Sequence, residues 1–300
     1  MINIVNKKKW FFLLSTVLIL PGVVSLFLFG LRLGIDFTGG SLLEIKKTAA
    51  ISQEEVRKII TDLGVEVATV QDSDNAYLVK TKALEGDQSK KIEDSLKAKD
   101  MSAEVIRVET VGPTIGQELL QKAILSLVVA SLAIVTYIAW AFRHVSEPVA
   151  SWKFGVAAIV ALIHDVLVVV GLFSILGHFL HVEIDSLFVT SLLTVIGFSV
   201  HDTIVVFDRI RENLRKRFPG TFAQLTNHSI IETLGRSINT TLTVVLVLLA
   251  LLLFGGSTIR WFVVALLVGI ISGTFSSIFN ASLVLVAWQE WSEKRSARKR

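Results

Sequence analysis

Six runs of the chain are apolar over about 20 residues, the length of helix that crosses the hydrocarbon core of a bilayer. Inside lipid a backbone N–H or C=O finds no water, so a segment of this kind is restricted to a helix, whose hydrogen bonds are internal. The composition agrees, because 52% of the 300 residues are hydrophobic and only 19% are charged. The chain is therefore predicted to be a polytopic α-helical membrane protein with six transmembrane helices. The runs are residues 10–31, 123–142, 154–176, 186–207, 237–258 and 261–287.

Lysine and arginine residues are concentrated on one side of these runs. The short connections on the other side, 177–185 and 255–260, carry a single arginine between them. Because cytoplasmic loops carry the excess of Lys and Arg, both termini are predicted to be cytoplasmic. The net charge of +4 is explained in this way, so membrane lipid is an expected partner and nucleic acid is not. The basic clusters are residues 7–9, 143 and 153, 209–217 and 294–300.

The segment 34–121 differs from the rest because it is rich in charge and alternates polar and apolar residues. Ser52 followed by Glu55 is a capping box that starts a helix. The order βαββαβ predicts an α+β ferredoxin-like domain, placed outside the cytoplasm between helices 1 and 2. The elements carry no nucleophile with a base and no phosphate loop, so docking is expected rather than catalysis. They are strand 42–47, helix 53–63, strand 65–70, strand 76–82, helix 88–99 and strand 102–111.

Four parts of the chain follow from these patterns. Residues 1–33 form the cytoplasmic N-terminus and first helix, expected to be an uncleaved anchor because no small-residue cleavage pattern follows it. Residues 34–121 form the extracytoplasmic domain, residues 122–288 the bundle of helices 2 to 6, and residues 289–300 a basic cytoplasmic tail. The absence of cysteine excludes disulfides, thiol catalysis and cysteine metal sites.

Asp202 is a carboxylate inside the fourth run. A charged side chain near the bilayer centre costs about 2.5 to 3.5 kcal/mol or more, so such residues face a protein interior or a wet cavity and mark ion paths. Helical spacing puts Thr190, Thr194, Gly197 and His201 on one polar strip, with Ser191 and Asp202 along its flank, so that these residues are expected to share one broad face. Small and hydroxyl residues also serve helix packing in lipid. Packing alone does not need an ionisable group, so Asp202 is predicted to lie on an ion pathway.

Arg236 is the predicted partner of Asp202. It begins a polar strip with Asn239, Thr240 and Thr243 at helical spacing in the antiparallel fifth run, at a depth similar to that of Asp202. Since arginine stays charged, its expected role is to stabilise the ionised carboxylate, or to release it as helices move. An arginine that only snorkels to the interface is the alternative.

Asp165 is a second ion-pathway candidate, near the middle of the third run and next to His164. Neither His164 nor His201 has a third ligand at metal spacing, so no metal and no cofactor are expected.

The connection between the first run and the insert is Gly34-Ile-Asp-Phe-Thr-Gly-Gly40. Paired glycines permit backbone geometries that other residues resist. A simple turn and a conformational hinge that transmits motion both fit this pattern. The hinge hypothesis assigns that role to Gly34, Asp36, Phe37, Thr38, Gly39 and Gly40.

Taken together, the glycine motif 34–40, the Ala161-Leu-Ile-His-Asp165 segment, the stretch Ile196 to Asn213 and Leu234-Gly-Arg-Ser237 closely resemble the SecD/SecF family, and within it SecF, of the resistance-nodulation-division (RND) superfamily. The resemblance covers nearly the whole chain. It implies an accessory subunit of the bacterial Sec translocase that uses the ion gradient to complete preprotein export. Family ion-pathway residues fall on Asp202 and Arg236, while Asp165 fits a His-Asp motif. One departure is His201, where relatives place Asn.

The resemblance also implies partners and a place in the cell. SecD would form a heteromeric complex with the chain, next to SecYEG with SecA, and YajC and YidC are further partners. The expected location is the bacterial plasma (inner) membrane. An RND-type exporter of small molecules or lipids, an intramembrane aspartyl protease using Asp165 and Asp202, and a passive scaffold are the competing hypotheses. No enzymatic activity is expected.

Overall fold

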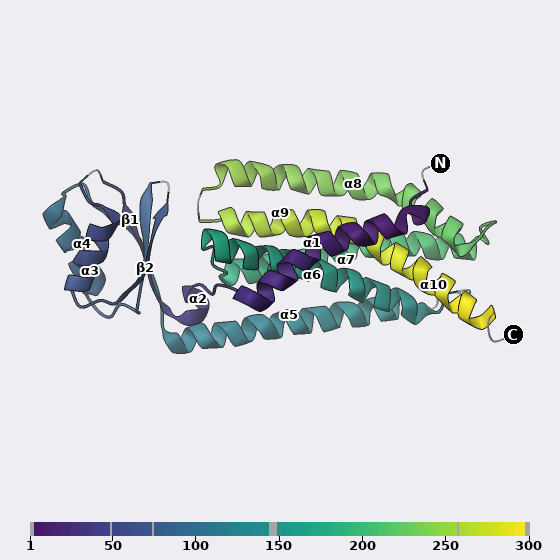
Figure 1. Ribbon diagram of the computed structural model, residues 1–300, viewed down its shortest axis with the longest axis horizontal. Helices are drawn as coiled ribbons and strands as arrows, with labels where there is room; N and C mark the ends of the chain where they lie inside the picture. The colour runs from purple at the N-terminus through teal and green to yellow at the C-terminus, as the bar shows by residue number, and fades with distance from the viewer. Residues whose placement is uncertain (1–2, 49, 74, 144–148, 257, 298–300) are drawn as a thin grey trace. The chain divides into compact units, whose positions relative to one another are not determined.

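The computed structural model describes residues 3–48, 50–73, 75–143, 149–256 and 258–297. The chain divides into two compact units. The first, called here the helical unit, comprises Met1–Arg32 with Ser126–Arg300, and the second, the βαββαβ unit, is Leu33–Leu125. Figure 1 labels the α-helices of both units and strands β1 and β2.

Six helices are long and apolar enough to cross a membrane, which confirms the predicted fold class. Side-chain caps begin the fourth and fifth of these helices: Asp185 accepts a 2.8 Å hydrogen bond from Phe188 N, and Thr221 forms a capping box with Gln224. The elements are η1 (Val5–Lys7), α1 (Lys8–Phe29), α5 (Pro113–Ala141), α6 (Ser151–Leu180), α7 (Ser186–Arg215), α8 (Phe222–Phe254), α9 (Arg260–Phe275), η2 (Ser276–Ala281) and α10 (Ser282–Ala297).

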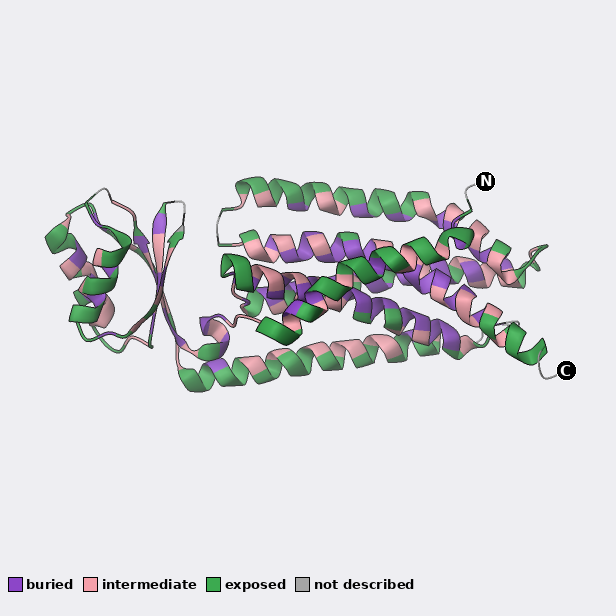
Figure 2. Ribbon diagram, in the orientation of Figure 1, coloured by how far each residue is buried: buried purple, intermediate pink, exposed green. Residues whose placement is uncertain are grey.

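The helices of the helical unit are buried to very different extents. The most apolar stretches of α6, α7 and the α9–α10 segment are 56%, 50% and 61% buried, against 17%, 6% and 17% for α1, α5 and α8. Figure 2 shows α5 and α8 mostly exposed. Many of the exposed side chains there are large and apolar, as a lipid-facing surface requires. α6, α7 and α9 therefore form the core of the bundle.

Close backbone approaches hold this core together. A Cβ on Gly269 of α9 would lie 2.2 Å from the Val195 side chain of α7. A Cβ on Gly22 of α1 would lie 2.7 Å from Gly171 of α6. Small residues at helix crossings are the usual means of tight packing in membranes. η2, between α9 and α10, is a π-helix, a form often found at functional positions.

The segments with predicted basic clusters meet at one end of the bundle. Ile4 N donates to Asn227 Oδ1 at 2.8 Å, next to the start of α8, and Lys8 pairs with Glu290 of α10 at 2.5 Å. At the other end Ile184 N donates to Arg32 O at 2.8 Å. Of the predicted basic tail, Arg298, Lys299 and Arg300 lie outside the described residues.

The βαββαβ unit has the predicted element order. Its sheet is antiparallel in the order β2-β3-β1-β4, which is the ferredoxin-like arrangement. The Ser52 and Glu55 capping box is present. β2 and β4 begin later than expected, because Gly64, at φ +78°, turns the chain after α3 and Ser102 N bonds Asp100 Oδ1 at 2.8 Å in a turn. The elements are α2 (Ile35–Thr38), β1 (Gly40–Lys46), α3 (Gln53–Asp62), β2 (Val67–Ser73), β3 (Ala76–Thr81), α4 (Gln88–Lys99) and β4 (Val105–Val111).

Candidate functional site

Asp202 lies in the core of the helical unit. α7 turns its side chain toward α9, and it is 2% exposed. Thr274 Oγ1 of α9 donates a 3.0 Å hydrogen bond to Asp202 Oδ2 and is itself 2.7 Å from Thr241 Oγ1 of α8. Since the Thr274 proton goes to the carboxylate, Thr241 is the donor of the second bond. Three helices therefore meet at this carboxylate through hydroxyl groups.

Asp165 is the second buried carboxylate, fully enclosed on α6. Ser199 Oγ of α7 donates to Asp165 Oδ2, and His164 Nδ1 lies 3.0 Å from Oδ1. Ser277 Oγ of η2 donates to Ser199 O at 2.8 Å and accepts from Thr203 Oγ1 at 2.8 Å. Asp165 is thus linked through serine and threonine hydroxyls to the same helix that carries Asp202.

The two carboxylates border one polar tract across the core. On α7, Ser199 and Asp202 are three residues apart, and on the α9–η2 segment Thr274 and Ser277 have the same spacing, so each pair shares a helix face. Asp165 and Asp202 accept from different hydroxyls, and no hydrogen bond joins these two described residues directly. The hydroxyls of the tract were not predicted as site residues, and only Ser199, three residues before Asp202 on the same helix, has a spacing that could have indicated it. They are Ser199, Thr203, Thr241, Thr274 and Ser277.

Arg236 does not pair with Asp202, which corrects the predicted ion pair between these two described residues. Its neighbour Ser237 is buried beside the Asp202 carboxyl, so the predicted similarity of depth holds. Arg236 itself is exposed. One residue along a helix rotates a side chain by about 100°, which turns Arg236 away when Ser237 faces the core.

The Arg236 side chain instead lines a cavity of about 300 Å³ between α7 and α8. The wall of this cavity is mainly charged. Arg209 of α7 holds Glu232 of α8 with two hydrogen bonds of 2.6 Å and Glu212 with one of 2.5 Å. A bidentate pair of this kind fixes both distance and orientation. The Asp-Arg-Ile-Arg-Glu-Asn stretch, whose sequence indicates the orientation and the family resemblance, therefore also ties α7 to α8.

His201 is exposed, as are Thr190, Thr194 and Gly197 of the predicted α7 strip. The strip therefore faces away from the core that encloses Asp202. The exposed positions Arg236, Asn239, Thr240 and Thr243 of α8 are likewise polar. Together these two strips form an outward polar surface, which is unusual for helices of this apolarity.

The glycine motif forms a packed structure in the βαββαβ unit. Residues Ile35–Thr38 make one helical turn, and Gly39 and Gly40 follow with φ of +73° and +131°. A Cβ on Gly39 would lie 2.7 Å from Pro113 Cα, where α5 begins, and one on Gly116 would lie 2.8 Å from Gly39 N. Glycine is required here both for the positive φ and for the close approach. The incoming and outgoing chain segments of the unit are thereby held together.

Among the described residues no group of three or more His, Cys, Asp or Glu side chains could hold a metal ion.

Comparison with known proteins shows which family the chain belongs to. Residues 91–291 match the model "Protein export membrane protein SecD/SecF, C-terminal", and residues 24–46 match the "SecD/SecF GG Motif". The chain is 49% identical to the protein translocase subunit SecF of Thermobaculum terrenum, over 96% of this chain and 94% of that protein.

Longer relatives contain the chain as one part. It is 37% identical to the protein translocase subunit SecDF of Bacillus subtilis, over 95% of this chain and 38% of that protein. The crystal structure of SecDF from Thermus thermophilus, described as a translocon-associated membrane protein, superimposes with a TM-score of 0.83 at 35% identity, over 96% of this chain and 39% of that chain. The chain thus spans less than half of these longer relatives and nearly all of the SecF protein. It is a multi-pass membrane protein that belongs to the SecD/SecF family of protein export membrane proteins.

Proposed function

We propose that the chain couples a proton or sodium motive force to the completion of protein export, as a SecF-type accessory subunit that acts with SecD in the bacterial plasma (inner) membrane. The observation that carries this proposal is Asp202, a carboxylate buried among transmembrane helices and held only by hydroxyl groups among the described residues. One charge crossing 100 mV is worth about 2.3 kcal/mol, enough to bias a two-state movement.

Protonation of Asp202 changes the hydrogen bonds that its carboxyl group can form. The ionised form accepts the hydrogen bond from Thr274, whereas the protonated form has a donor of its own and a weaker acceptor. Binding of the ion to Asp202 therefore loosens the contact between α7 and α9, and loss of the ion re-forms it. In the arrangement that follows this loosening, the Asp202 carboxyl group turns toward Arg236, which is one residue from Ser237. Asp165 responds on the other side of the same hydroxyl tract.

The proposed switch reaches the βαββαβ unit through the glycine motif. Gly39 is packed on Pro113, so a displacement of the incoming segment is passed to the first turn of α5 rather than absorbed by a loose loop. Preprotein is the expected partner of the βαββαβ unit.

SecD is the proposed partner of the outward polar surface on α7 and α8. In the SecDF relatives a single polypeptide contains a region similar to this chain and a longer remainder. His201, Arg236 and Asn239 are exposed on apolar helices, where lipid contact is costly, so a second membrane subunit would shield them. SecYEG with SecA, together with YajC and YidC, are proposed as the further assembly.

The proposed orientation has both termini in the cytoplasm. The N-terminus, the α7–α8 connection and α10 share one end of the bundle, which is also the end rich in Lys and Arg. The proposed role is not enzymatic. An aspartyl protease needs two carboxylates that share a proton, and Asp165 and Asp202 instead accept from Ser199 and Thr274.

The test is gradient-dependent preprotein translocation into inverted membrane vesicles. Asp202→Asn and Arg236→Met, at normal abundance and with SecD association retained, should lose the stimulation by the gradient. Asp208→Asn is the matched control, since Asp208 is an exposed carboxylate on the same helix that pairs with Arg211; it should keep the stimulation. Full stimulation in Asp202→Asn would rule out the proposal and leave a passive scaffold. Separate proton and sodium gradients identify the ion.

A further inference from the structure

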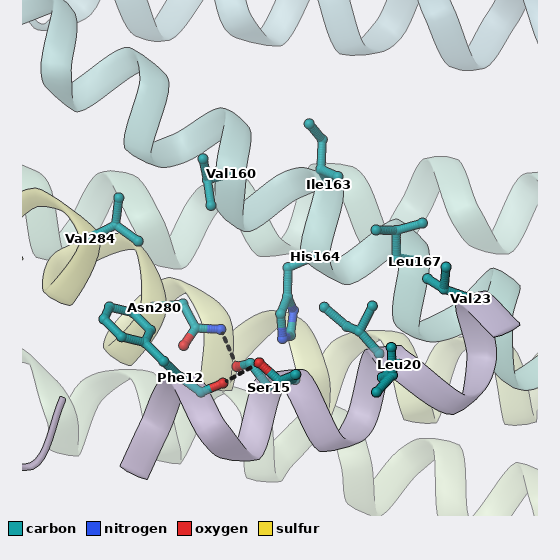
Figure 3. A pocket seen from close by; sticks show the side chains of 12 residues that line it. Phe12, Ser15, Leu20, Val23, Val160, Ile163, His164, Leu167, Asn280 and Val284 are labelled. Atoms are coloured by element: carbon teal, nitrogen blue, oxygen red, sulfur yellow. Dashed lines mark hydrogen bonds between the residues drawn. The ribbon is translucent and has the colours of Figure 1, made fainter. Parts of the chain in front are cut away.

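A cavity of about 460 Å³ lies between α1, α6 and the η2–α10 segment of the helical unit. Its volume is in the range of small-molecule sites. Figure 3 shows its lining side chains, which are mostly aliphatic or aromatic and include Phe12, Leu20, Val23, Val160, Ile163 and Leu167. Leu20 and Ile163 are 57% and 52% exposed, so the cavity opens on the apolar surface of the bundle. Its opening faces the region that lipid occupies.

Three buried polar side chains from different elements, Ser15, His164 and Asn280, line this apolar cavity. His164 and Asn280 are 6% and 4% exposed. One polar atom of each is bonded, because His164 Nδ1 lies 3.0 Å from Asp165 Oδ1 and Asn280 Nδ2 donates to Ser15 Oγ at 2.7 Å. The other polar atom of each, His164 Nε2 and Asn280 Oδ1, has no hydrogen-bond partner among the described residues. Figure 3 shows both side chains directed toward the part of α1 that carries Ser15.

Both unpaired atoms, His164 Nε2 and Asn280 Oδ1, require a hydrogen-bond donor as their partner. In the tautomer whose Nδ1–H donates to Asp165 Oδ1, Nε2 of the His164 ring is an acceptor. Asn280 Oδ1 is an acceptor as well. A hydrocarbon chain in the cavity would leave both unpaired, which is unfavourable for buried polar atoms. A ligand with an O–H group would satisfy at least one of them.

The depth of the cavity limits the ligand further. His164 is near the middle of the 30-residue helix α6, so the polar atoms lie far from either membrane surface. A charged headgroup is strongly disfavoured at that depth. The cavity extends along α1 from Phe12 to Val23, about 16 Å of helix, which leaves room for a hydrocarbon tail.

We infer that this cavity binds a neutral, lipid-soluble alcohol. Its hydroxyl group donates to Asn280 Oδ1 or His164 Nε2, and its hydrocarbon body lies between α1 and α6. Because His164 bonds Asp165 through its other nitrogen, the bound alcohol sits one side chain away from a membrane carboxylate. The site does not depend on the proposed export function.

The experiment uses the full chain in phosphatidylcholine vesicles and a photoreactive hexadecanol with a mid-chain diazirine. The matched probe is its methyl ether, which keeps the shape and loses the donor. Labelled peptides are identified by mass spectrometry. One hydrogen bond predicts that the alcohol labels α1 and α6 about twofold to tenfold more than the ether. Unlabelled hexadecanol should compete more strongly than hexadecane.

Variants of the chain test whether His164 and Asn280 cause the preference for the alcohol over the ether. The double variant Asn280→Leu/His164→Phe should reduce labelling by the alcohol to the level of the ether, and the two single variants identify which acceptor is used. Thr16→Val is the matched control, because Thr16 also lines the cavity but donates to Phe12 O at 2.9 Å; it should keep the preference. If a variant fails to fold, the comparison of hexadecanol with hexadecane on the native chain still decides.

Two results would overturn the inference. Equal labelling by alcohol and ether in the native chain would mean that the cavity holds only hydrocarbon. Loss of labelling when a second membrane subunit is co-purified, with labelling retained in the isolated chain, would mean that the cavity belongs to a protein interface.

Discussion

The two units of the chain bury opposite kinds of side chain. Among the described residues the buried polar side chains of the βαββαβ unit are Ser41 and Thr81, which are cross-strand partners in the β1–β3 pair. The helical unit buries two carboxylates and a tract of hydroxyls, while many large apolar side chains lie on its surface. The interior of the βαββαβ unit therefore provides stability, whereas the interior of the helical unit contains groups that can change charge. Substitutions in the two interiors should differ accordingly.

The largest loss of stability is expected in the apolar interior. Ile60→Ala removes a fully buried side chain from the core of the βαββαβ unit and should lower its free energy of unfolding by about 2 to 5 kcal/mol. Hydrogen exchange of peptides within Leu33–Leu125 of the full chain measures this loss. Met101→Ala is the control, since Met101 is 93% exposed and should change stability by less than about 0.5 kcal/mol. Similar effects at both positions would contradict an ordered apolar core.

The glycine motif should show the next largest effect. Gly39→Ala requires an alanine at φ +73° with its Cβ 2.7 Å from Pro113 Cα, whereas Gly64→Ala meets only the strained φ of +78° with no atom within 4 Å. A positive φ costs an alanine about 1 to 2 kcal/mol. We expect Gly64→Ala to lose about that much and Gly39→Ala clearly more. Equal losses, measured by the same exchange experiment, would show that the motif is a turn without tight packing.

In the helical unit the hydroxyl group of Ser277 should stabilise the bundle through its hydrogen bonds. Ser277→Ala removes the group that bridges Ser199 and Thr203, and should destabilise the bundle by about 1 kcal/mol in thermal unfolding in detergent. Ser272→Ala is the matched control, because Ser272 Oγ is buried with no hydrogen-bond partner in the part of the chain that the structure describes, so its removal should be neutral or stabilising. If the control costs as much as Ser277→Ala, the tract contributes only packing.

The smallest effect is expected on the surface of the βαββαβ unit. The pKa of Glu55 is lowered to about 2, first by the hydrogen bond from Lys99 and then by those from Ser52. A lowered pKa in the folded state stabilises the fold above the unfolded pKa of 4.5, and this contribution disappears as the pH falls toward 2. The loss of stability in Glu55→Gln should therefore be present at pH 7 and vanish between pH 4.5 and 2. Glu54→Gln is the control, because it also removes one carboxylate from the same helix. A loss of stability in Glu55→Gln that does not depend on pH would contradict the pairing of Glu55 with Lys99.

Much of the fold was accessible from the sequence, because hydrophobic periodicity reports burial directly. The six spans and the βαββαβ order follow from runs and alternations, and Ser52 with Glu55 marks a helix start in one local pattern. The burial of Asp202 follows from the cost of a charge in lipid, while its role and that of Asp165 stay predictions. The predicted pairing of Arg236 with Asp202 was wrong. α8 carries polar residues on more than one face, and their spacing does not say which of these faces packs against the bundle core. Serine and threonine hydroxyls of the tract resemble ordinary packing residues, and a π-helix has no clear sequence pattern.

The π-helix η2 sets the register of everything after it. Ser277 on this segment bonds α7, Asn280 bonds Ser15 of α1, and beyond it Gln289 accepts from Lys153 of α6 at 3.0 Å. A π-turn inserts one extra residue into an α-helix. If the same residues formed a regular α-helix instead, α10 would be rotated by about 100°, so that Gln289 and Glu290 would face away from Lys153 and Lys8. The orientation of the C-terminal helix therefore depends on η2 keeping its extra residue in a π-turn, whereas deleting that residue would leave the faces of α10 nearly unchanged.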